Sequence, residues 1–64
     1  MNREQERVVE HLSKSGGKST LDKLVADVGK VSFLHIATLR EAGIIDYHVE
    51  FHDGKPVVML EVTA

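Results

Sequence analysis

Four histidines in a chain of 64 residues offer the most obvious chemistry, because imidazole binds metal ions and exchanges protons near neutral pH. His48, Glu50 and His52 alternate along one stretch, so in a strand they would share a face. Four residues of strand span roughly 13 Å, which is too far for both imidazoles to reach one ion at about 2.1 Å. We therefore expect a solvated strand face, with a metal site shared across a dimer as the alternative.

The other residues give no sign of catalysis. His11 and His35 stand alone in the sequence, and the absence of Cys removes thiolate metal sites and disulfides. The sequence contains no glycine-rich phosphate loop after a strand, no GxSxG and no HExxH. A chain this short also lacks room for a sizeable pocket. We predict a binding module that is not an enzyme, with no metal, no cofactor and no small-molecule substrate.

Length and composition predict one soluble domain over residues 1–64, with 42% hydrophobic and 28% charged residues. A domain of this size buries only roughly 60% of the surface that its unfolded chain exposes. No stretch has the length of a membrane span or the pattern of a signal peptide, so we expect a cytoplasmic protein without a membrane partner. The net charge of -2 is unusual for a nucleic-acid domain, which normally has a basic excess.

The central element is a predicted helix over 32–42. Ser32 can cap its first turn, and Gly43 can take the left-handed conformation that ends a helix. Ile36 lies on the face that would contact a core. Leu34 is two positions away, about 200° round the helix, so we expect it to point outward. The alternative is a helix rotated by one position, with Leu34 and Phe33 in the core.

Two further helices precede it. Asn2 and Gln5 form a capping pair for a first helix, whose apolar residues recur at helical spacing until Gly16. Ser19 and Asp22 give a second capping signal, and the apolar stripe that follows ends at a glycine before the central helix. The connections are short, so the three helices should pack together.

From Ile45 the pattern changes to strict alternation, which is typical of a strand with one buried face. Asp53 and Gly54 are a strong signal for a two-residue hairpin turn, and we predict a hairpin over 45–62. Pro56 should lie at an edge or near the turn. Centring the turn on that pair predicts three apolar cross-strand pairs: Val49 with Val58, Tyr47 with Leu60, and Ile45 with Val62.

Three helices followed by a hairpin is the order of a winged helix-turn-helix. HIATLREAGII, residues 35–45, resembles the end of the recognition helix in ArsR and MarR transcriptional regulators, which reads roughly HLxxLREAGLV. HDGKPVVML, residues 52–60, resembles their wing. The resemblance implies an α+β fold in the order α-α-α-β-β, with 32–42 as recognition helix and 45–62 as wing.

The resemblance also implies double-stranded DNA as the partner of a dimeric transcriptional regulator or chromatin-associated factor. In that superfamily the third helix enters the major groove, while the wing and the start of helix two meet the backbone. Phosphate contacts position such a protein, and contacts to base edges specify sequence. The residues carried over to DNA binding are Lys18, Ser19, Thr20, Lys30, His35, Thr38 and Lys55.

The chain departs from the family at the residues just before His35. Where those regulators usually have Ser and Arg, this chain has Phe33 and Leu34. The alternative is therefore a winged helix that binds a protein or a second copy of itself through apolar residues. We expect DNA binding and keep protein binding as the alternative, for which the candidate residues are Phe33, Leu34, Ala37, Val57 and Met59.

Overall fold

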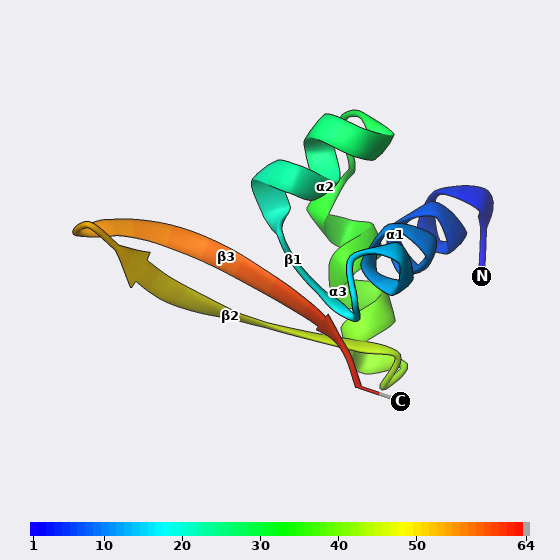
Figure 1. Ribbon diagram of the computed structural model, residues 1–64. Helices are drawn as coiled ribbons and strands as arrows, with labels where there is room; N and C mark the ends of the chain where they lie inside the picture. The colour runs from blue at the N-terminus through cyan, green and yellow to red at the C-terminus, as the bar shows by residue number, and fades with distance from the viewer. Residues whose placement is uncertain (64) are drawn as a thin grey trace.

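The computed structural model describes residues 1–63. In chain order its elements are α1 (Arg3–Lys14), β1 (Lys18–Thr20), α2 (Leu21–Val28), α3 (Phe33–Glu41), β2 (Ile45–His52) and β3 (Lys55–Val62). The three helices pack together, and the long hairpin of β2 and β3 projects away from them (Figure 1). The predicted α+β class is confirmed. Within the described residues, no helix has the length and apolar character needed to cross a membrane.

The helix boundaries follow from local capping. At α1, Asn2 and Gln5 form the predicted capping box, in which the backbone N–H of Gln5 donates to the Asn2 side chain at 2.9 Å. At α3, the Ser32 hydroxyl accepts from the amide of Leu34 at 3.2 Å. Gly43 follows with a φ of 75°, the left-handed conformation expected of it. The predicted helix 32–42 is thus confirmed to within one residue at each end.

The predicted order α-α-α-β-β is wrong because residues 18–20 form a strand. This strand, β1, pairs antiparallel with β3, so the order is α-β-α-α-β-β and the sheet has three strands in the order β1-β3-β2. Ser19 therefore lies in a strand, and Thr20 caps α2 by accepting from the amide of Lys23 at 3.1 Å. Three residues are too few to show a period, and their partner strand lies at the other end of the chain.

The hairpin has the predicted turn and the predicted register. Asp53 and Gly54 have φ values of 54° and 77°, so both take the positive φ that a type I′ turn requires. All three expected apolar pairs are confirmed, and the pairing continues without a bulge to the turn. Pro56 lies opposite Phe51 beside the turn, as expected. This is a non-hydrogen-bonded pair of the β2–β3 ladder, so the missing N–H of proline costs no hydrogen bond there.

The core lies between the helices and the root of the hairpin. Its fully buried side chains come from every helix and from both long strands: Val8, Leu12, Leu24, Ile36, Leu39, Ile45 and Leu60. Further along β2, Val49 is 54% exposed and Phe51 is 72% exposed. The prediction that one whole hairpin face is buried is therefore wrong beyond the root, because the hairpin extends past the helices that could cover it (Figure 1).

Replacement of Gly54 by Val tests the turn. A β-branched residue is strained at positive φ, so Gly54→Val should lower the free energy of unfolding by about 1 kcal/mol or more. Urea denaturation measures the loss, and faster amide exchange in β2 with unchanged exchange in α1 would place it in the hairpin. Asp53→Asn is the control, since Asn tolerates positive φ and should change stability by less than about 0.5 kcal/mol. Equal stability of the two variants would contradict the turn assignment.

Candidate functional site

The outer face of α3 is apolar at its first turn. Ile36 and Leu39 point into the core, and Leu34 points outward with 71% of its surface exposed, as predicted. Phe33 beside it is 50% exposed. The Thr38 hydroxyl donates to the backbone carbonyl of Leu34 at 2.9 Å, so its hydrogen is used within the helix. The exposed part of α3 therefore offers hydrocarbon more than free polar groups.

This apolar surface continues from α3 onto the hairpin. The ring of Phe33 meets the ring of Tyr47 edge to face, with centroids 5.3 Å apart. Val49 and Phe51 follow Tyr47 at the two-residue repeat of a strand, so they lie on the same hairpin face. We call Phe33, Leu34, Tyr47, Val49 and Phe51 the apolar strip. It joins the start of α3 to the outer part of the hairpin.

A charged pair borders the apolar strip at the root of the hairpin. The Arg40 guanidinium lies over the Tyr47 ring, 4.3 Å from its centroid, which is a cation–π contact. Its Nε donates to the Asp46 carboxylate at 3.0 Å. Arg40 is the one Lys or Arg within α3, and both contacts direct it toward the hairpin. The first turn of α3 thus has no Lys or Arg of its own.

The opposite hairpin face is polar. Glu50 lies between two histidines, with carboxylate–imidazole distances of 2.7 Å to His48 and 3.0 Å to His52. These hydrogen bonds, that from His48 first, lower the pKa of Glu50 to about 2. The two rings bond to different oxygens of one carboxylate, and within residues 1–63 no three His, Cys, Asp or Glu are grouped to hold a metal ion. Val57 and Met59 lie on this face, paired with Glu50 and His48, and are half-buried.

The residues expected to contact DNA are spread over several segments. Lys18, Lys30 and Lys55 are exposed, at the start of β1, in the turn before α3 and at the hairpin turn. The hairpin turn projects away from the helices, and so from the turn that joins α2 to α3 (Figure 1). Thr20 is half-buried as the cap of α2, and Ser19 is only 5% exposed. On α3, His35 and Ala37 are half-buried and Thr38 is exposed.

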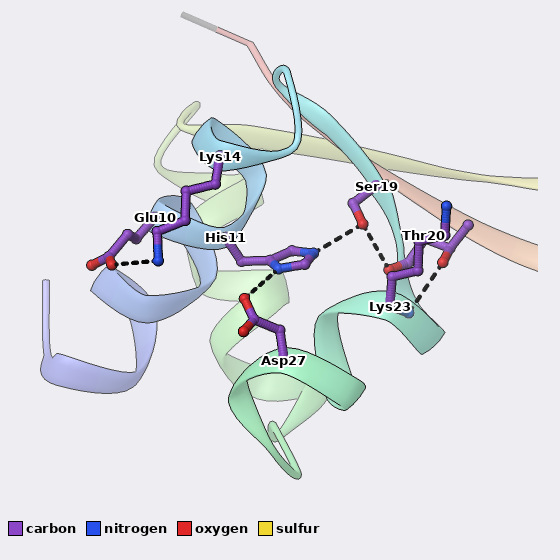
Figure 2. Close-up of polar contacts among 7 residues, drawn as sticks. All are labelled: Glu10, His11, Lys14, Ser19, Thr20, Lys23 and Asp27. Carbon is purple, nitrogen blue, oxygen red and sulfur yellow. Dashed lines mark hydrogen bonds and ion pairs between the residues drawn. The ribbon is translucent and has the colours of Figure 1, made fainter.

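A hydrogen-bond network around the buried His11, which the sequence did not reveal, links α1, β1 and α2 (Figure 2). His11 is 8% exposed, and its Nδ1 lies 2.7 Å from the Asp27 carboxylate. Its Nε2 lies 2.9 Å from the Ser19 hydroxyl. Each ring nitrogen of His11 thus has one polar partner, the carboxylate at Nδ1 and the hydroxyl at Nε2, and the hydroxyl can serve as donor or acceptor. The available signal was that His11 follows Val8 by three residues, on the same inward helix face.

This network has the connectivity of a Ser-His-Asp catalytic triad but lacks access to the serine. Ser19 is buried in β1 and its hydroxyl also contacts the Thr20 carbonyl at 3.4 Å. A shallow pocket of about 140 Å³ does reach the network, but it opens beside Asp27 and not at Ser19. It is also smaller than the roughly 300 Å³ at which ligand pockets begin. The network is a structural link in which each ring nitrogen of a buried histidine has a partner.

The network also gives folding a dependence on pH. The hydrogen bond from His11 holds the pKa of the Asp27 carboxyl below its usual range. A carboxyl with a lowered pKa in the folded state adds stability at pH values above its unfolded pKa. That contribution is lost as the pH falls through the lowered folded value.

Comparisons with protein-family models, curated proteins and solved structures found no match for this chain. The apolar strip is exposed to solvent, whereas in the His11 network only the Asp27 carboxylate is exposed.

Removal of His11 tests the network. His11→Ala leaves the buried Ser19 hydroxyl without its imidazole partner and opens a cavity, so the free energy of unfolding should fall by about 2 kcal/mol. Chemical denaturation at neutral pH measures this. His52→Ala, which changes an exposed imidazole, should cost under about 0.5 kcal/mol. Similar losses in the two variants would mean that the buried network adds little to stability.

Proposed function

We propose that this chain is a winged-helix interaction module that binds a protein through the apolar strip. The support for a winged helix is the arrangement of three helices with a terminal hairpin, together with the sequence resemblance at residues 35–45 and 52–60. The observation that favours protein as the ligand is exposure. Leu34 and Phe51, which stand at the two ends of the strip, are 71% and 72% exposed.

The size of the strip supports this proposal. Phenylalanine rings bury 150–250 Å² in cores, so the four most exposed side chains of the strip present on the order of 400 Å² of apolar surface. That is about a tenth of the solvent-accessible surface of the described structure, which totals 4300 Å². Apolar patches of roughly 300–600 Å² on far larger monomers are often functional sites. Water contact with this surface is unfavourable, and a partner that covers it gains the hydrophobic contribution of burial.

The charge distribution supports the same choice. Major-groove reading uses side chains with donors and acceptors directed at base edges. At the start of α3 those positions hold Phe33 and Leu34, and Arg40 further along is paired with Asp46. The chain has a net charge of -2, so it lacks the overall attraction to phosphate that basic domains have.

Substitution of Leu34 separates binding from folding. Because Leu34 is exposed, Leu34→Glu should change the free energy of unfolding by less than about 0.5 kcal/mol while abolishing protein association. A photoreactive phenylalanine analogue at position 34 should form, in cells that express the chain, a covalent adduct of defined mass with the partner protein. The unlabelled parent chain should compete for that adduct and Leu34→Glu should not. The same analogue at Val25, exposed on α2, is the control site.

A loss of several kcal/mol in Leu34→Glu would place Leu34 in the core and remove the proposal. Equal adducts at positions 34 and 25 would mean that the contact is non-specific.

DNA is the second candidate ligand, favoured by the exposed lysines on three segments that the resemblance assigns to the phosphate backbone. Lys30 precedes α3 and Lys55 adjoins the hairpin turn, so both cations flank the helix and wing that would approach a duplex. Phosphate contacts of this kind are independent of sequence and sensitive to salt. A weak, salt-dependent affinity for any duplex is the behaviour expected from so few cations.

A salt titration tests the DNA candidate. Labelled duplex should bind at low salt with amide shifts at Lys18, Lys30 and Lys55. Lys30→Ala and Lys55→Ala should each reduce the slope of log affinity against log salt by about one, because each removes one phosphate contact. Lys14→Ala, whose amine pairs with Glu10 on α1 at 3.1 Å, is the control. No amide shift at low salt would exclude DNA as the ligand.

A further inference from the structure

The outer edge of β2 is open to another strand. The sheet order β1-β3-β2 puts this eight-residue strand at an edge. In a hairpin with a two-residue turn, the pair flanking the turn exchanges hydrogen bonds, and every second pair does the same. Tyr47, Val49 and Phe51 fall between those pairs, so their N–H and C=O groups point away from β3. Accordingly, the Tyr47 amide donates to the Asp46 side chain at 2.8 Å.

This edge lacks most of the features that usually prevent strand pairing, and its only charged side chains are the carboxylates of Asp46 and Glu50. Proteins protect exposed edges with Lys, Pro, bulges or very short strands. The segment Ile45–His52 contains no Lys, Arg, Pro or Gly and pairs with β3 without a bulge. The other long strand is protected, because Pro56 lies near its tip and β1 covers its root. The hairpin is therefore blocked on the β3 side and open on the β2 side.

The sequence of β2 is complementary to itself in the antiparallel direction. With two copies of β2 centred on Val49, each pair on one face is apolar and each pair on the other joins a carboxylate to an imidazole. Aromatic pairs and opposite-charge pairs stabilise neighbouring strands. The backbone permits this register, because it sets odd-numbered residues opposite odd-numbered residues. Their N–H and C=O groups, which point away from β3, would then face one another. The pairs are Val49 with Val49, Tyr47 with Phe51, His48 with Glu50, and Asp46 with His52.

Neighbouring registers lose this complementarity. A shift by two residues in one direction sets Glu50 opposite Glu50 and His48 opposite His52. A shift in the other direction sets His48 opposite His48 and Asp46 opposite Glu50. Like charges directly opposite one another destabilise adjacent strands. A shift by one residue would set the apolar face of one strand against the polar face of the other.

We propose that the β2 edge binds the β2 edge of a second copy of this chain, antiparallel and centred on Val49. The two three-stranded sheets then become one continuous sheet with two-fold symmetry. This inference rests on the proposed function and names its partner. The two apolar strips lie side by side on one face, and Phe51 of the second copy lies beside Tyr47, next to Phe33. The outward N–H and C=O groups of Val49 and Phe51 on both edges gain partners, and the Tyr47 amide exchanges the Asp46 carboxylate for a strand partner.

Sedimentation equilibrium of the full chain is the first test, and it should show a dimer whose dissociation constant lies below about 1 mM. Val49→Lys places two cations opposite each other at the symmetry axis and should raise that constant at least about tenfold. Val25→Lys makes the same change at an exposed position of α2 and should leave the dissociation constant unchanged. Val49 is 54% exposed, so the monomer fold should persist, as an amide spectrum would show.

A charge exchange tests the register. His48→Glu sets a second carboxylate opposite Glu50 of the other copy and should weaken the dimer. The double variant His48→Glu, Glu50→His restores a carboxylate–imidazole pair and should return the dissociation constant to near that of the parent. In a mixture of isotope-labelled and unlabelled parent chain, filtered NMR should detect contacts between Tyr47 and Phe51 of different copies. This last measurement does not depend on any variant.

Three results would overturn the inference: a monomer at about 1 mM, a dimer unaffected by Val49→Lys, or a dimer without contacts between Tyr47 and Phe51 of different copies. A monomeric chain that still gives a competed adduct from position 34 with another protein would remove the dimer and retain the proposed function. A dimer with the expected register but no adduct at position 34 would retain the β2 pairing and remove Leu34 from the binding surface. If the chain forms no dimer and gives no adduct at position 34, both the β2 pairing and the proposed function are removed.

Discussion

The seven fully buried side chains of the core extend only as far as the root of the hairpin. Three helices of 12, 8 and 9 residues can surround Ile45 and Leu60 but cannot reach the outer half of two eight-residue strands. A small domain buries a small fraction of its surface, so part of any long apolar strand stays in water. The same constraint that limits stability here exposes Val49 and Phe51, and these residues are central to the proposed interaction surface.

The hairpin is held to the helices by contacts at both of its strands. Ile45 and Leu60 are buried in the core, and β1 adds a backbone ladder to β3. The His11 network extends this connection, because one imidazole links Ser19 of β1 to Asp27 of α2 from its position on α1. With a core of this size, a satisfied polar contact inside the fold fixes the orientation of β1 in a way that apolar packing alone does not.

The hairpin of β2 and β3 has two faces and one open edge, and they differ in chemistry. One face continues the apolar surface of α3 through the contact between Phe33 and Tyr47. The other holds the hydrogen bonds of Glu50 with its two histidines. An edge strand with one apolar face and one ionic face can select a partner in a single register, since pairing must satisfy both faces at once. The polar face would therefore provide specificity while the apolar face provides affinity.

The sequence by itself determined the features that depend on near neighbours: the caps at Asn2 and Ser32, the turn at Asp53, the register that follows from that turn, and the outward direction of Leu34. Each rests on a backbone preference or on a helical or strand period. The tertiary structure alone decided that residues 18–20 form a strand, that Ser19 is buried against His11, and that the hairpin face is exposed beyond its root. These depend on residues distant in sequence coming together, or on how far the helices reach, and neither is encoded in any local period.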